Sequence, residues 1–376
     1  MHAHQIHLPS VASLSREAFR SDVEPQLGLV FASSATFRDG TLGRALRDAC
    51  PATTWLGCST AGQISNRGTD DTGLVLSGLA FDDPNFKVVT AEVSGMSDSH
   101  ATGRRLSQEL APAAPHTLLV FAPGTNINGS KLLEGLLSGL PNARIAGGLA
   151  GDGSDFRETF TLHNESVSAS QVVVVGFSSP RLRFAFGSRG GWRPFGPARR
   201  VTRVDGNVLY ELDSEPALAV YKRYLGEHAA GLPASGLLFP LSILNGQHEE
   251  VGLIRTILAI DNDSGSLILA GDVPPNGYLQ LMHASTDSLV QGATLAAESA
   301  RLDGSGQGFG LLVSCVGRKL VMGGRTDEEI DAVIETLGLS NIYAGFHSYG
   351  EISPGSNTVG CDLYNQTMTV SFLRED

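Results

Sequence analysis

The chain has 376 residues, of which 41% are hydrophobic and 18% are charged, a composition that excludes an intrinsically disordered protein. Its formal net charge of −12 argues against a nucleic-acid partner and against attraction to an anionic membrane. No stretch approaches the roughly 20 apolar residues of a membrane-spanning helix, the first ten residues show no export signal, and the four scattered cysteines form no disulfide or zinc pattern. We therefore expect a cytoplasmic protein without membrane insertion.

The N-terminal part of the chain contains a strand–helix–strand pattern. An apolar strand (27–33) is followed by a helical segment (41–49), a glycine-bounded turn (56–62) and a closing apolar run (73–81). Short apolar runs bounded by turn residues are typical of buried strands, whereas 3.6-residue spacing indicates a helix.

The same order of segments occurs twice more. The second copy comprises 117–124, 130–140, 147–153 and 171–177, and the third comprises 309–317, 327–339, 344–350 and 366–373. Strands 88–93 and 278–284 each precede a helical segment and a repeat, as lead-in strands. Units this long and this few indicate domain duplication rather than a solenoid. We predict an α/β fold of duplicated strand–helix units, with mixed β-sheets because hairpins such as 256–271 add antiparallel strands.

The middle of the chain differs from the repeats. Residues 186–226 are rich in glycine, proline and aromatic residues, pass through a hairpin at Gly206–Asn207, and end in a predicted helix over 215–226. We place a domain boundary near residue 200, which gives domains 1–200 and 201–376.

The first glycine turn resembles the G-x-S-x-G elbow that presents a nucleophilic serine in α/β hydrolases. The three turns align on Gly57/Gly62, Gly148/Gly153 and Gly345/Gly350, so that Ser59 corresponds to Ala150 and His347. Because the glycines recur and the serine does not, we expect no enzyme. A hydrolase using Ser59 or Cys58, and a scaffold without a ligand, remain alternatives of other classes.

Glycine turns of this kind either cradle a ligand with their N–H groups or only pack one sheet closely on another. The polar side chains in the first and third turns favour a pocket. The candidate ligand-binding residues are Cys58, Ser59, Thr60, His347, Tyr349, Glu351 and Asn365.

Several motifs occur together in one order: GCSTAGQI, GGLAGDG, the G-W-x-P-x-G of 191–196, and GFHSYGEISP followed by LYNQTMTV. In this combination the chain resembles the FIST family, with an N-terminal and a C-terminal FIST domain, from about residue 25 to the end. The resemblance implies a sensory, ligand-binding protein of prokaryotic signal transduction, with small ligands such as amino acids. Stand-alone FIST proteins of this length also resemble the NosP type, haem proteins that sense nitric oxide and control a histidine kinase.

This resemblance implies haem b as a candidate cofactor and a histidine kinase or a cyclic-dinucleotide signalling protein as the partner, with a homodimer as a candidate assembly. An amino acid or another small organic ligand without haem is the alternative. The family's usual aromatic residue is His347 here. Because haem needs an axial ligand such as histidine in an apolar pocket, we name His347, and then His163, as candidate haem ligands.

Overall fold

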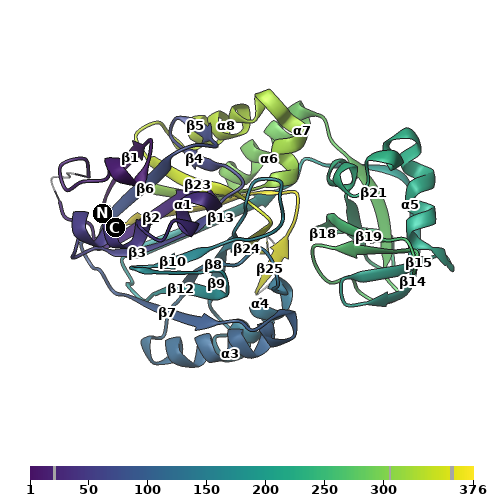
Figure 1. Ribbon diagram of the computed structural model, residues 1–376, viewed down its shortest axis with the longest axis horizontal. Helices are drawn as coiled ribbons and strands as arrows, with labels where there is room; N and C mark the ends of the chain where they lie inside the picture. Colours follow the sequence, from purple (N-terminus) through teal and green to yellow (C-terminus); the bar gives the residue numbers. More distant parts are fainter. Residues whose placement is uncertain (20–22, 305, 356–359) are drawn as a thin grey trace.

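The structure, a computed structural model, describes residues 1–19, 23–304, 306–355 and 360–376. It consists of a large body, which contains both chain termini, and a smaller lobe at one end of the body (Figure 1). Within the described residues, no helix is long and apolar enough to cross a membrane.

The body contains three six-stranded sheets that share one plan. In each sheet the lead strand lies at one edge and pairs with the closing strand. The closing strand pairs with the first of two parallel strands, and the second parallel strand pairs with a hairpin at the other edge. The first sheet has the order β1 (His2–Leu8), β6 (Leu74–Ala80), β2 (Leu27–Ala32), β3 (Thr54–Ser59), β10 (Thr161–His163), β11 (Ser166–Ser168). The second has β7 (Phe86–Glu92), β12 (Gln171–Phe177), β8 (Thr117–Ala122), β9 (Arg144–Leu149), β24 (Gly350–Pro354), β25 (Cys361–Tyr364). The third has β13 (Leu182–Arg189), β26 (Met368–Glu375), β22 (Phe309–Cys315), β23 (Ile342–Ser348), β4 (Gln63–Ser65), β5 (Gly68–Asp70).

The hairpins are exchanged among the three units. Hairpin β4–β5 follows β3 in the chain but pairs with β23. Hairpin β10–β11 follows β9 but pairs with β3, and hairpin β24–β25 follows β23 but pairs with β9. Each unit therefore completes the sheet of another, and the body is a closed three-part assembly.

The three units meet at a ring of backbone hydrogen bonds. The Ala61 N–H donates to the His347 carbonyl at 2.9 Å. The Gly151 N–H donates to the Ser59 carbonyl at 2.9 Å, and the Tyr349 N–H donates to the Leu149 carbonyl at 3.2 Å. The pattern makes Ser59, Leu149 and His347 equivalent. The predicted match of Ser59 to Ala150 was wrong by one residue.

The glycines confirm this shift. A Cβ atom on Gly57, Gly147 or Gly345 would lie 1.9, 2.0 or 1.7 Å from a carbonyl oxygen of the adjacent parallel strand. The equivalent glycine of the second unit is therefore Gly147. The sequence offered two adjacent glycines there, and only the strand register distinguishes Gly147 from Gly148.

The core lies between the sheets, where Phe31, Phe121 and Phe346 pack together. Helices with apolar faces cover the sheets from outside, as Figure 1 shows for α3 beneath the second sheet. The helices of the body are α1 (Ser34–Arg38), α2 (Leu42–Ala49), α3 (Ser99–Leu110), α4 (Gly129–Gly139), α6 (Thr286–Ser299), α7 (Val316–Met322) and α8 (Asp327–Leu337).

The lobe is inserted between β13 and α6 of the third unit. It has its own apolar core, one α-helix, α5 (Ala217–Leu225), two short 3-10 helices and an eight-stranded sheet. The sheet order is β18 (Glu250–Arg255), β17 (Leu241–Leu244), β21 (Tyr278–His283), β14 (Arg193–Asp205), β15 (Val208–Leu212), β20 (Ser266–Leu269), β19 (Ile257–Asp261), with β16 (Glu215–Pro216) beside β15. Two neighbouring chain segments, 190–192 and 284–285, join the lobe to the body.

The insertion corrects two predictions. The lead-in strand of the third unit is β13, because it pairs with β26, whereas the expected strand at 278–284 is β21 of the lobe. The helix predicted over 215–226 begins only at Ala217, because Glu215 and Pro216 pair with β15. The boundary predicted near residue 200 falls inside β14, and the division of the chain into domains at that point stays a prediction.

Candidate ligand-binding site

The predicted site residues gather where the three sheets meet, and most are inaccessible. Cys58, Ser59, His347, Glu351 and Asn365 have no exposed surface, and Thr60 and Tyr349 have little. Burial raises the pKa of the Cys58 thiol well above its ordinary value. Gly57, Gly147 and Gly345 of these turns pack closely on the backbone of the adjacent parallel strands.

Ser59 is held by the backbone. Its hydroxyl donates to the Gly151 carbonyl at 2.7 Å and accepts from the Phe160 N–H at 2.9 Å. A nucleophilic serine needs a base and access to substrate, and this hydroxyl instead joins two units of the body.

His347 lies between β22 and β4, with its Nε2 3.2 Å from the Thr69 hydroxyl. Burial, reinforced by the charges of Lys319 and Arg318, lowers its pKa to about 3, so the ring is neutral. A Cβ atom on Gly62 would come within 3.1 Å of the ring.

The two candidate haem ligands, His347 and His163, have different surroundings. His347 and His163 line none of the three cavities between lobe and body, described below. His163 is on β10, and its Nε2 lies 3.3 Å from the Asn164 side-chain nitrogen. His347, whose ring has no exposed surface, therefore does not fit haem in this conformation, whereas His163 is partly exposed.

Glu351 is a fully buried carboxyl group. The Ser348 hydroxyl donates to it at 2.7 Å, and the Thr367 N–H and hydroxyl each donate at 3.0 Å. These donors favour the charged form, but burial dominates and raises the pKa of Glu351 to about 8.

This pKa predicts a dependence of stability on pH. An unfolded glutamate releases its proton near its ordinary pKa of 4.5, whereas folded Glu351 keeps the proton up to about pH 8. The contribution of Glu351 to stability is therefore complete below pH 4.5 and is lost as the pH rises to 8, by about 1.4 kcal/mol per pH unit. Denaturant unfolding from pH 5 to 8 should show this decline in the wild type. Glu351→Gln should flatten it, whereas Glu158→Gln, at an exposed position, should not; equal slopes in wild type and Glu351→Gln would contradict the prediction.

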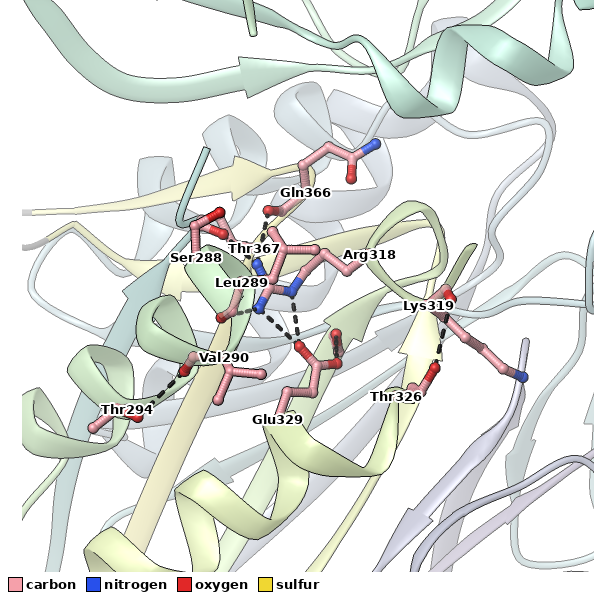
Figure 2. Close-up of polar contacts among 12 residues, drawn as sticks. Ser288, Leu289, Val290, Thr294, Arg318, Lys319, Thr326, Glu329, Gln366 and Thr367 are labelled. Atoms are coloured by element: carbon pink, nitrogen blue, oxygen red, sulfur yellow. Dashed lines mark hydrogen bonds and ion pairs between the residues drawn. The ribbon is translucent and has the colours of Figure 1, made fainter. Parts of the chain in front are cut away.

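A second buried charge cluster was not predicted from sequence. Figure 2 shows Arg318 of α7 directed at Glu329 of α8, with Nη2 2.8 Å and Nε 3.0 Å from one carboxylate oxygen. Arg318 also donates to the carbonyls of Leu289 and Gly190, and Ser314 donates to Glu329. Both charged side chains have no exposed surface. This cluster joins α6, α7, α8 and the segment that leads to the lobe.

Accessible space lies between the lobe and the body. A cavity of about 270 Å³, which we call the polar cavity, opens at the carboxyl ends of β8 and β9. The carboxyl edge of parallel strands is where α/β proteins commonly bind ligands. Thr125, Asn126 and Asn128 line it from the body, and Asn207 and Gly271 line it from the lobe.

Of the predicted site residues, Tyr349 lines this cavity. Its hydroxyl donates to the Asp152 carboxylate and accepts from the Phe156 N–H at 3.2 Å. Its ring stacks on Phe156 with centroids 4.2 Å apart. Tyr349 thus fixes the loop 152–157, whose Phe156 lines the polar cavity.

The chain matches the model of the FIST N domain over residues 26–215 and that of the FIST C domain over residues 217–354. It belongs to the FIST family. FIST domains are associated with the sensing of small ligands in signal transduction.

One relative of this FIST protein is the Uncharacterized protein MJ1623 of Methanocaldococcus jannaschii, which is 22% identical in an alignment 353 residues long that covers 86% of this chain and 66% of that protein. The chain therefore spans about two thirds of the length of that relative. Among solved structures, a cyanuric acid hydrolase from A. caulinodans aligns over 100% of this chain and 98% of its own, with 9% identity and a TM-score of 0.37.

Two further cavities of the FIST protein border the lobe. One, of about 580 Å³, which we call the apolar cavity, is lined by Leu237 and Leu238 of the lobe and by Leu320 of α7. The other, of about 730 Å³, is lined by charged side chains that include Arg144, Arg189 and Glu250.

Apart from Tyr349, the residues of the polar and apolar cavities were missed by sequence reasoning. The turn 124–128 had a usable signal, since it follows an apolar strand and ends with Asn128, whose side chain accepts from the Lys131 N–H at 3.0 Å and caps α4. The lobe residues gave no such signal, because only the folded chain brings them to the body.

Polar contacts hold the lobe beside the polar cavity. The Asn128 amide donates to the Asp272 carboxylate at 3.1 Å, and Lys131 lies 3.9 Å from the same group. On the lobe's other contact with the body, Arg255 donates to the Leu363 carbonyl at 3.1 Å and Gln366 donates to the Leu237 carbonyl at 3.0 Å. Domain contacts of this polar kind commonly permit relative motion.

Proposed function

We propose that this FIST protein is a sensor that binds a small organic ligand in the cleft between lobe and body, and that the bound ligand changes the position of the lobe for a separate signalling protein to read. One observation carries the proposal: the polar and apolar cavities are each lined by residues of both lobe and body. A ligand that contacts both the lobe and the body favours the lobe position in which it can contact the two at once.

The connections of the lobe suit such a movement. Segment 190–192 contains Gly191, whose φ of +77° is in the left-handed region, and segment 284–285 leads directly into α6. Because the two segments are neighbours, as the pairing of Arg193 with His283 shows, they form a single narrow connection. A coupling of about 1–3 kcal/mol between ligand and lobe position suffices for a signalling switch.

The partner in this proposal is a histidine kinase or a cyclic-dinucleotide signalling protein, as the family resemblance implies. Nitric oxide sensing by haem is the competing form of the proposal. It is disfavoured by the burial of His347, whose surroundings would have to open before its ring met a porphyrin.

A thermal-shift screen of amino acids and small organic acids tests the proposal, followed by hydrogen exchange with the best ligand. We expect ligand-dependent protection both at 124–129 of the body and at 269–271 of the lobe. Leu258→Arg, at a side chain that lines both cavities, should abolish the shift. Leu339→Arg, at a leucine that is 81% exposed outside these cavities, is the matched control.

Two results would contradict the organic-ligand proposal. One is protection that is confined to a single side of the cleft. The other is a stoichiometric Soret band, shifted by nitric oxide, in protein expressed with haem precursor; this band would establish the competing haem form.

A further inference from the structure

The two cavities of the cleft adjoin each other and differ in their polar groups. The polar cavity is lined by a threonine and three asparagines as well as by apolar side chains, whereas the polar side chains of the apolar cavity, among the described residues, are Ser154 and Ser235. We propose that the ligand is a small amphiphile, an inference that rests on the proposed function. Its head group carries an acceptor oxygen and lies in the polar cavity, and its hydrocarbon tail lies in the apolar cavity.

The apolar cavity is built for hydrocarbon. Its lining includes Pro233, Ala234, Leu237, Leu238, Ile257 and Leu320, and no charged residue among the described ones lines it. Leu320 is 45% exposed and Leu258 is 39% exposed. Large apolar side chains that gather at an open cavity mark a surface that another apolar group covers. A tail placed there would remove these leucines from water.

The polar cavity offers unused hydrogen-bonding groups. The Asn128 and Asn207 amides are already engaged, with Asp272 and with the Leu269 carbonyl. Within the described part of the chain, by contrast, the side chains of Thr125 and Asn126 make no hydrogen bond to protein groups. A hydroxyl and an amide N–H that lack protein acceptors suit a head group with carboxylate or amide oxygens.

Phe156 and Leu258 connect the two cavities. Both residues line the polar cavity and the apolar cavity, one from the body and one from the lobe. A single molecule that passes between these two side chains has its polar end beside Asn126 and its apolar end beside Leu237. A purely polar metabolite would leave the apolar cavity unfilled, and a plain hydrocarbon would leave Thr125 and Asn126 without a partner.

The chain-length dependence of binding tests this inference. The probes are hexanoate, octanoate and decanoate, with octanamide as the uncharged counterpart of octanoate, titrated by calorimetry into the full chain below their micelle concentrations. We expect each added methylene that is fully buried to lower Kd about fourfold, as follows from about 0.8 kcal/mol per buried methylene. Comparison of octanoate with octanamide distinguishes a carboxylate head from an amide head.

Two pairs of variants locate the tail and the head. Ala234 is exposed and lines the apolar cavity, so Ala234→Trp should fill that cavity and weaken decanoate binding at least tenfold. Ala230→Trp, at an exposed alanine of the same lobe surface that does not line the cavity, is the control. Asn126→Gly keeps the left-handed backbone, with φ of +57°, and Thr125→Val keeps the side-chain shape. Both should weaken all chain lengths by a similar factor.

The outcomes separate this inference from the proposed function. Binding of a polar molecule that depends on Asn126 but is unaffected by chain length and by Ala234→Trp would overturn the amphiphile and leave the sensor proposal standing. Equal loss of decanoate binding in Ala230→Trp and Ala234→Trp would also overturn the amphiphile, because it would place the tail outside the cavity. If neither the alkanoates nor any molecule of the thermal-shift screen binds, both proposals fail.

Discussion

Replacement of Glu329 by alanine is expected to lower the free energy of unfolding by about 3–5 kcal/mol, because it leaves the Arg318 guanidinium charged, buried and without its carboxylate. Arg318 then retains only the carbonyls of Gly190, Leu289 and Gln366, which accept from Nη1 and Nη2 without neutralising its charge, and the Nε–H that donated to Glu329 loses its acceptor. Urea unfolding followed by circular dichroism measures the loss. Because Gly190 lies at the connection to the lobe, hydrogen exchange should also increase over 190–192.

A surface ion pair provides the control for this prediction. The Arg38–Glu158 pair has a distance of 2.9 Å, close to that of Arg318–Glu329, but its side chains are 56% and 46% exposed. Arg38→Ala should therefore cost less than about 1 kcal/mol. Equal losses in Arg38→Ala and Glu329→Ala would show that burial does not set the strength of the Arg318 cluster. Arg318→Met with Glu329→Leu should recover part of the loss, but not all, because three carbonyls and Ser314 lose their partners.

Gly345→Ala is expected to prevent the body from folding at 25 °C, or to cost more than about 3 kcal/mol. The added methyl group would lie 1.7 Å from the Leu312 carbonyl oxygen, and the obstacle is backbone that cannot rotate away. Relief would require β22 and β23 to separate at the point where the three units meet. Soluble yield and the urea midpoint measure the effect.

Gly324→Ala is the matched control, because a Cβ atom on Gly324 would meet nothing within 4 Å and its φ is not in the left-handed region. We expect a change within about 1 kcal/mol there. If Gly345→Ala folded with near-wild-type stability, the close approach of the parallel strands could not be the reason for the recurring glycines.

The sequence alone determined the local structure and the family of this protein. Helix α4 follows from the spacing of Leu132, Leu133 and Leu136, since helical periodicity is recorded in neighbouring residues. The sequence pattern of two apolar strands, the second ending in a glycine turn, occurs three times and can be recognised without a structure. The ordered motifs of the glycine turns indicated a FIST protein, and the family models confirm it.

The tertiary structure decided what is accessible. Ser59 and Tyr349 occupy similar polar turns in the sequence, yet Ser59 is enclosed by two units whereas Tyr349 reaches a cavity. The hairpin exchange, the insertion of the lobe, and the contact of Asn126 with the same cavity as Leu258 all bring together residues that are distant in the chain. Sequence periodicity records which face of an element is buried, but it does not record which distant element covers that face; only long-range packing settles that choice.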